Sequence, residues 1–260
     1  MKSFFILLIA LFVGIGASPI IEPTQRIVGG KESKIADRPY QVLFKTPGKE
    51  ICGGALVEAN MVLTTGSCCK RLDSNKTEVI AGLESLPATI PTINKNKIEE
   101  IKFKDGKKDY TLQSNICIVA LKKNFDISKP EIKTIPISDK PVAPKVTISG
   151  WGSSDINKPY EPSNKLMEVE LDIYDIKECQ KVYTNVQDMD KTMICTLTPS
   201  KGFCAGDFGD PLVTKDKDTN KLSGLAAWGF GCASKDYPGV YTDVTRFKEW
   251  IESTMSALKQ

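Results

Sequence analysis

The stretch that decides the fold is CAGDFGDPLV, residues 204–213. A cysteine precedes a Gly-Asp-X-Gly turn, and a proline after the turn opens an apolar run typical of a strand. Such a turn presents the side chain at X, and here X is Phe208, which has no nucleophilic atom. The turn is therefore kept without a group that could attack a substrate.

Composition limits what the rest of the chain can be. The 260 residues are 41% hydrophobic, enough for one substantial core or two small lobes that share an interface. The formal net charge is +3 with both signs interspersed, which argues against a nucleic-acid partner. Residues 95–108 are rich in lysine, but Glu99, Glu100 and Asp105 interrupt them, so we expect a solvated loop or strand edge.

The N-terminus predicts export. Lys2 precedes the apolar run FFILLIALFVGIG, and the small residues Ala17 and Ser18 follow it, the pattern of a cleavable signal peptide over 1–17. We expect a short propeptide at 18–26, a single domain at 27–260 and a secreted, extracellular protein without a membrane span. The eight cysteines suit disulfides in an oxidising environment, and Asn75 begins a sequon for N-glycosylation.

Short strand-like runs dominate the remaining sequence. Turns rich in Gly, Pro, Asn and Lys separate them at fairly even spacing, which favours an all-β barrel or sandwich. Apolar residues at helical intervals predict a terminal helix over 245–259. The predicted strands are YQVLF (40–44), NMVLTT (60–65), TEVIAGL (77–83), ICIVALK (116–122), KVTISGW (145–151), KLMEVELDIY (165–174), KLSGLAAWGF (221–230) and GVYTDV (239–244).

Seven motifs in order give the chain a resemblance to the trypsin-like serine proteases of the chymotrypsin fold over residues 26–259. The motifs are RIVGG (26–30), CGGALVEANMVLTTGSC (52–68), GWG (150–152), MIC (193–195), CAGDFGDPLV (204–213), WGFGC (228–232) and PGVYT (238–242). The resemblance implies two six-stranded β-barrels with a C-terminal helix.

The resemblance also implies three disulfides: Cys52–Cys68, Cys179–Cys195 and Cys204–Cys232. Bridges of this size contribute about 2 to 4 kcal/mol each. Cys69 and Cys117 are left over, either as a fourth bridge or as two free thiols, and we expect the bridge.

The catalytic positions of the family correspond to Ser67, Cys117 and Phe208. Acyl transfer needs a nucleophile, a base that takes its proton and a carboxylate that orients the base. None of these groups stands at its position, and the chain contains no histidine. We therefore expect no peptidase activity. Two replacement mechanisms stay open: Ser67 with a lysine as its base, and a thiolate of Cys69 or Cys117 as the nucleophile.

The binding features of the cleft depart from the family as well. The oxyanion hole would use the N–H groups of Gly206 and Phe208, and a carboxylate at Asp210 would repel an oxyanion unless it points away. The base of the specificity pocket corresponds to Gly202. Its walls correspond to Phe203, Ala227, Gly229 and Gly239. Phe208 either folds into this pocket or points into solvent.

The maturation motif is intact. In active relatives, cleavage after the residue that matches Arg26 frees an amine at the residue matching Ile27, and this amine pairs with the carboxylate matching Asp207. Because a buried charge needs a partner, we hypothesise that cleavage survives as a folding switch. The alternative is inheritance of the motif without use.

A complete trypsin framework with all three catalytic positions replaced is similar to the scabies mite inactivated serine protease paralogues, which resemble mite group 3 allergens. That resemblance implies a monomer that inhibits host complement or other plasma proteins through a surface away from the cleft. Residues 95–108 and 153–165 are candidate contact loops.

We expect no metal, cofactor or membrane partner. A residual hydrolase, another regulatory homologue or decoy, and a basic heparin-binding homologue remain as alternatives, the last with little support from the net charge of +3.

Overall fold

The computed structural model describes residues 27–86, 89–106, 109–140, 142–153, 157–158, 160–185 and 188–259. The predicted signal peptide and propeptide, including Arg26, lie outside the described residues. So do 107–108, 154–156 and 159 within the two candidate contact loops.

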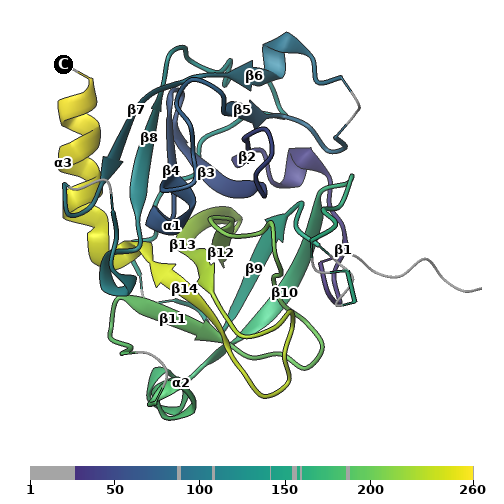
Figure 1. Cartoon of the computed structure of the whole chain (residues 1–260), viewed down its shortest axis with the longest axis vertical. Helices are drawn as coiled ribbons and strands as arrows, with labels where there is room; N and C mark the ends of the chain where they lie inside the picture. Colours follow the sequence, from purple (N-terminus) through teal and green to yellow (C-terminus); the bar gives the residue numbers. More distant parts are fainter. Residues whose placement is uncertain are drawn as a thin grey trace, which may run out of the picture.

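The N-terminal half folds into an antiparallel sheet that curls into a nearly closed barrel, drawn in blue and teal in Figure 1. Alternating residues of its strands point inward, so that Val42 and Phe44 lie in one cluster with Val62 and Val119, whereas Leu43 packs in another. In order across the sheet, the strands are β6 (Lys95–Asn96), β5 (Glu78–Ala81), β2 (Gln41–Lys45), β3 (Cys52–Glu58), β4 (Met61–Thr64), β8 (Cys117–Leu121) and β7 (Ile98–Phe103).

The C-terminal half forms a closed barrel. The strand at residues 145–150 ends the order of the sheet, and it also pairs with the strand at residues 167–174, which closes the circle. The short β1 (Lys31–Glu32) adds to the outside of β10. In order around the barrel, the strands are β10 (Met167–Tyr174), β11 (Met193–Thr196), β14 (Gly239–Asp243), β13 (Thr219–Trp228), β12 (Pro211–Asp216) and β9 (Lys145–Gly150).

The predicted two-barrel class is confirmed. The C-terminal barrel has the expected six strands, whereas the N-terminal sheet has a seventh, the two-residue β6. This strand forms because a 3₁₀ turn at Thr92–Asn94 returns the chain to β5, where Lys95 pairs with Ile80. The lysine-rich stretch thus begins as sheet edge, as expected, and its Lys95 and Lys102 pair with nearby glutamates.

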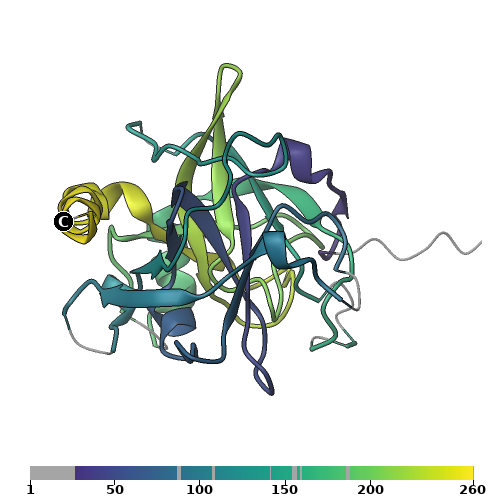
Figure 2. The same ribbon diagram turned by 90° about the horizontal axis from the view of Figure 1, so that it is seen from above.

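In the described part of the chain, three α-helices flank the barrels: α1 (Gly66–Cys69), α2 (Ile176–Tyr183) and α3 (Lys248–Leu258). The predicted terminal helix is present as α3, beside the N-terminal barrel in Figures 1 and 2. It begins at Lys248 because Val244–Phe247 form a 3₁₀ turn. The remaining 3₁₀ turns are Ile35–Asp37 and Leu112–Ser114. None of the helices in the described part of the chain is long and apolar enough to cross a bilayer.

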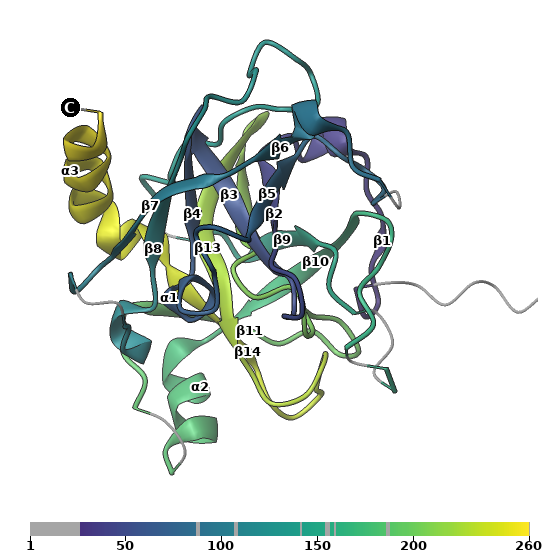
Figure 3. The ribbon, with the colours of Figure 1, turned by 45° about the horizontal axis from the view of Figure 1, so that its top comes forward.

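A shared core joins the two barrels. Ala55, Leu63 and Ile118 of the first barrel pack with Val213 and Leu225 of the second. The chain therefore folds as two lobes that pack through apolar side chains. Figure 3 shows the arrangement of the strands of both lobes.

Candidate functional site

The three predicted catalytic positions come together near the end of β4. Ser67 lies in α1 and donates a 3.1 Å hydrogen bond to Thr65, while Cys117 Sγ, at the start of β8, lies 3.4 Å from the Thr65 carbonyl oxygen. The turn carrying Phe208 abuts the same place, since a Cβ on Gly209 would lie 2.1 Å from Thr64 Oγ1. The fold thus brings the three predicted catalytic positions into one region of the protein.

Ser67 has a hydroxyl but no recorded base within the part of the chain that the structure describes. Its Oγ donates to Thr65, and its N–H donates to Asn115 Oδ1 at 2.8 Å. Lys70, three residues further on, is paired with Asp109 at 2.9 Å. A neutral hydroxyl in these surroundings is a weak nucleophile.

Cys117 forms a disulfide with Cys69, so the leftover cysteines are bridged in the structure. Both residues are buried, and the bond joins α1 to β8. A disulfide sulfur is neither a thiolate nucleophile nor a group that can orient a base. The three bridges implied by the family are present as well, and no described cysteine is free.

The two N–H groups predicted for an oxyanion hole are not used by the described residues, and Asp210 is turned away into the protein. Among the residues described, neither Gly206 N–H nor Phe208 N–H has a recorded hydrogen-bond acceptor. The Asp210 side chain is turned into the protein, where it accepts a 2.5 Å hydrogen bond from Gln41 Nε2. Of the two alternatives for Asp210, the structure therefore has the carboxyl pointing away from the cleft.

Phe203 fills the specificity pocket. Its buried ring lies against two of the glycines predicted to line the pocket, since a Cβ on Gly239 would be 2.9 Å from Phe203 Cε1 and one on Gly229 would be 3.7 Å from Cζ. The ring packs edge-on against Tyr241 at 5.2 Å between centroids. Gly202, which lines the remaining pocket, and Ala227 are both buried, but Ala227 is not among the described residues that line that pocket.

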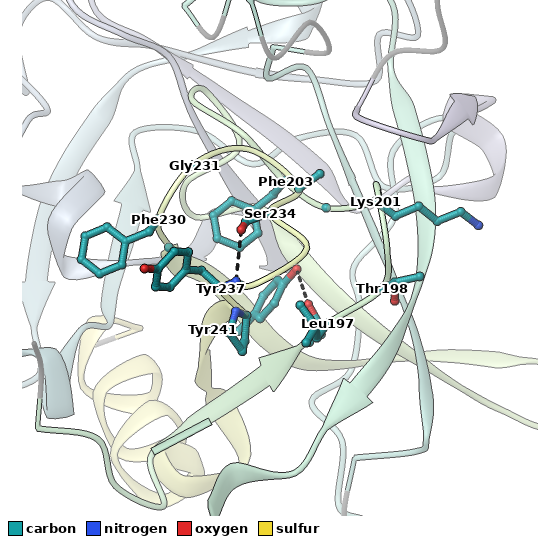
Figure 4. Close-up of a pocket in the computed structure, with 15 residues that line it drawn as sticks. Leu197, Thr198, Lys201, Phe203, Phe230, Gly231, Ser234, Tyr237 and Tyr241 are labelled. Atoms are coloured by element: carbon teal, nitrogen blue, oxygen red, sulfur yellow. Dashed lines mark hydrogen bonds between the residues drawn. The ribbon is translucent and has the colours of Figure 1, made fainter. Parts of the chain in front are cut away.

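The pocket that remains is shown in Figure 4 and measures about 20 Å³. That volume holds about one water molecule. It has no room for the side chain of a substrate residue. The sequence predicts Phe203 only as a wall of the pocket. The available signal was a large aromatic residue at a pocket position whose other predicted lining residues are small.

Phe208 neither plugs the pocket nor projects freely into solvent. Its partly buried ring stacks edge-on over Phe203 at 6.0 Å between centroids. On its other side the guanidinium of Arg71 lies 5.6 Å from the ring centroid, and Arg71 is itself paired with Glu50 at 2.8 Å. Phe208 therefore forms a second layer above the filled pocket, held by a cation–π contact.

Asp207 and Ile27 are both buried. Asp207 accepts hydrogen bonds from the N–H groups of Gly152 at 2.7 Å and Cys204 at 2.9 Å. Burial raises the pKa of its carboxyl to about 6, against the lowering effect of these N–H groups. Ile27 packs beside Phe203 and Tyr241 with a φ of 45°, which is unusual for a β-branched residue.

The predicted glycosylation acceptor is accessible. Asn75 is exposed in the turn before β5, and its N–H donates to Asp73 Oδ1 at 3.0 Å. The hydroxyl of Thr77, which completes the sequon, is buried against Thr46. Only the acceptor side chain must be reached by a glycan, so the turn is compatible with modification.

Comparison with known proteins agrees with this geometry. The Trypsin family profile matches residues 27–251. Trypsin epsilon of Drosophila erecta is 31% identical over 232 residues, which cover 88% of this chain and 87% of that protein. Trypsin of Sarcophaga bullata is 30% identical over 240 residues, which cover 90% of each chain. The chain belongs to the trypsin family.

Proposed function

We propose that this chain is a secreted member of the trypsin family that does not hydrolyse peptides and acts by binding. The observation that carries the proposal is the state of the three catalytic positions. These positions hold Phe208, Ser67 and Cys117, and Cys117 is bonded to Cys69 in a disulfide. The sequence also has no histidine that could act as the base. Loss of the nucleophile or the base of such a triad lowers turnover by about 10⁶.

The filled pocket supports the same proposal. An enzyme of this family holds the side chain next to the scissile bond in its specificity pocket, which places the reacting carbonyl. With Phe203 and Phe208 stacked there, a substrate would have no such anchor. Free N–H groups at the oxyanion position would then have no correctly placed carbonyl to polarise.

The partner in this proposal is complement or another plasma defence protein of a host, a choice that rests on the resemblance to the inactivated mite paralogues. The contact surface lies away from the cleft, on the loops around 95–108 and 153–165. Exposed charges of both signs on β7 and the adjoining residues give the first of these a polar surface suited to an interface rim.

We further propose that cleavage between Arg26 and Ile27 matures the chain. Support comes from the buried Asp207, which has no recorded ion pair with a lysine or arginine in the described ranges, and from the unusual φ of Ile27. Cleavage would relieve that conformation and supply a positive charge. N-terminal sequencing of the secreted protein should find chains that begin at Ile27, and their absence would reject this part of the proposal.

The test of the binding proposal is affinity capture. The folded chain is immobilised, host serum is passed over it, and retained proteins are identified by mass spectrometry. Complement components retained intact support the proposal, and fragments with a consistent cut site contradict it. Alanine and serine substitutions in 95–108 or 153–165, with a similar set in the exposed β12–β13 turn at 217–218 as control, then test the proposed surface.

A further inference from the structure

Two carboxyl groups meet inside the protein at the base of the Phe208 turn. Asp207 is 0% exposed and Asp210 is 1% exposed. A Cβ built on Gly150 would lie 1.8 Å from Asp210 Oδ2 and 2.6 Å from Asp207 Oδ1. Oxygens of the two acids therefore occupy the same small space.

The groups around the pair supply hydrogen bonds but little positive charge. Asp207 binds two backbone N–H groups, of Gly152 and Cys204. Asp210 Oδ1 binds Gln41 on β2, whose own Oε1 accepts from Ser149 on β9 at 2.7 Å. Asp210 Oδ2 has no recorded partner.

The charged and titratable neighbours do not neutralise the pair. Glu50, between β2 and β3, adds negative charge near Asp207. Tyr241 of β14 is buried, and the negative charge of Asp207 helps to raise the pKa of its phenol. Arg71, whose guanidinium lies over the Phe208 ring, is paired with Glu50. In the described ranges, neither acid has a recorded ion pair with lysine or arginine.

Two like charges in contact and out of water are strongly unfavourable. Burial, and then the neighbouring Asp207, raise the pKa of Asp210 well above its usual range. A proton held between Asp210 Oδ2 and Asp207 would give the unpaired oxygen a hydrogen bond and leave one charge, which the N–H groups of Gly152 and Cys204 stabilise. The protons of such a pair belong to both acids together.

Main-chain hydrogen bonds hold the loop that carries the pair and fills the pocket. Within the loop, Asp207 N–H donates to Cys204 O and Asp210 N–H to Asp207 O. Outward, Gly53 N–H of β3 donates to Phe208 O at 2.8 Å, and Ala226 of β13 is hydrogen-bonded to both Gly209 and Asp210. We propose that, in the chain that is not cleaved at Arg26, Asp207 and Asp210 share one proton and form a pH-dependent latch that holds residues 203–210, with both phenylalanines, against the two barrels.

The direction of the pH effect follows from the two raised pKa values. Below about pH 4 both acids are neutral in the folded and unfolded chain, and the stabilisation is fully present. Above that, the unfolded chain ionises first, so stability falls as the pH rises through about 6 for Asp207 and further for Asp210. Loss of the shared proton puts two charges in one space and loosens the loop.

Hydrogen exchange tests the latch. The full chain carries Arg26→Gln, so that no new α-amine arises at Ile27, and exchange of residues 203–210 is followed from about pH 5 to about pH 9. We expect protection, corrected for intrinsic rates, to fall at least about tenfold, the equivalent of one pKa unit. Asp210→Asn should reduce this fall to the part that Asp207 alone causes near pH 6, whereas Asp218→Asn, on an exposed turn, should leave the whole fall unchanged. Equal protection across the range, or the same fall in Asp210→Asn, would overturn the proposal.

Infrared spectroscopy of the same Arg26→Gln chain covers the case in which Asp210→Asn does not fold. The carbonyl band of a protonated carboxylic acid should persist at neutral pH, where an exposed aspartate is ionised. Absence of this band at neutral pH would overturn the shared proton directly.

Discussion

Replacing Phe203 by alanine should reopen the specificity pocket. The ring is buried against two glycines and two further aromatic rings, and truncating such a phenylalanine costs about 3 to 5 kcal/mol in the free energy of unfolding. Because the residual pocket of about 20 Å³ adjoins the ring, water can enter the space, and we expect a cost near the lower end of that range.

Binding of a small aromatic molecule measures whether the specificity pocket has opened in Phe203→Ala. Gly202 brings no charge to the pocket, so the probe is neutral indole, titrated calorimetrically into Phe203→Ala and into the unvaried chain. We expect saturable binding to the variant alone. Phe230→Ala is the matched control, since Phe230 borders the same pocket but is 44% exposed; it should cost less than about 1 kcal/mol and bind no indole. Equal indole binding by Phe203→Ala and the unvaried chain, or an unchanged urea midpoint in the variant, would refute the assignment of Phe203 as the filling residue.

Three further predictions concern the frame of the cleft. Replacing Cys69 and Cys117 together by serine opens a loop with a sequence separation of 48 and should lower the free energy of unfolding by about 4 kcal/mol in urea titrations; a loss below about 1 kcal/mol would contradict a formed bridge. Gly150→Ala places a Cβ 1.8 Å from Asp210 Oδ2 and should cost about 1 to 3 kcal/mol or more, and Asp210→Gly in the same chain should restore part of it; absence of any rescue in a double-mutant cycle would show that the clash lies elsewhere. Asn75→Gln should abolish the glycosidase-sensitive mass of the exported protein, and an unchanged mass would show that the exposed acceptor is unused.

Much of the fold was predictable because it depends on ordered motifs and on residue periodicity. Alternating apolar residues identified strands such as β10 and β14, and helical spacing identified α3. The short β6 was not predicted, since two residues carry no periodic pattern and their pairing with β5 depends on a turn at Thr92–Asn94.

The positions of the candidate site were predictable, but the directions of its side chains were not. A sequence shows that residue 208 is aromatic, whereas the choice between Phe203 and Phe208 as the filling ring depends on the space left by Gly229 and Gly239. The inward turn of Asp210 likewise depends on glycines at 53 and 150, which come from two other strands. Contacts of this kind are set by packing between segments distant in sequence.

The stacked phenylalanines and the disulfide give one physical account of the altered cleft. The disulfide occupies a position where a hydrolase has a group that takes part in proton transfer. The two phenylalanine rings occupy the space where a hydrolase binds a substrate side chain. Under the proposed function, the fold is retained while function lies on other surfaces, as happens widely among folds shared by unrelated activities. Restoring the catalytic residues alone would leave Phe203 in the pocket.

The most direct test of the absence of catalysis is turnover of a fluorogenic peptide library by the chain after cleavage behind Arg26. The account predicts no hydrolysis above that of buffer, and the same result for Ser67→Ala. Hydrolysis by the unvaried chain that disappears in Ser67→Ala would assign a working nucleophile to the only hydroxyl at the three catalytic positions, and would contradict the account.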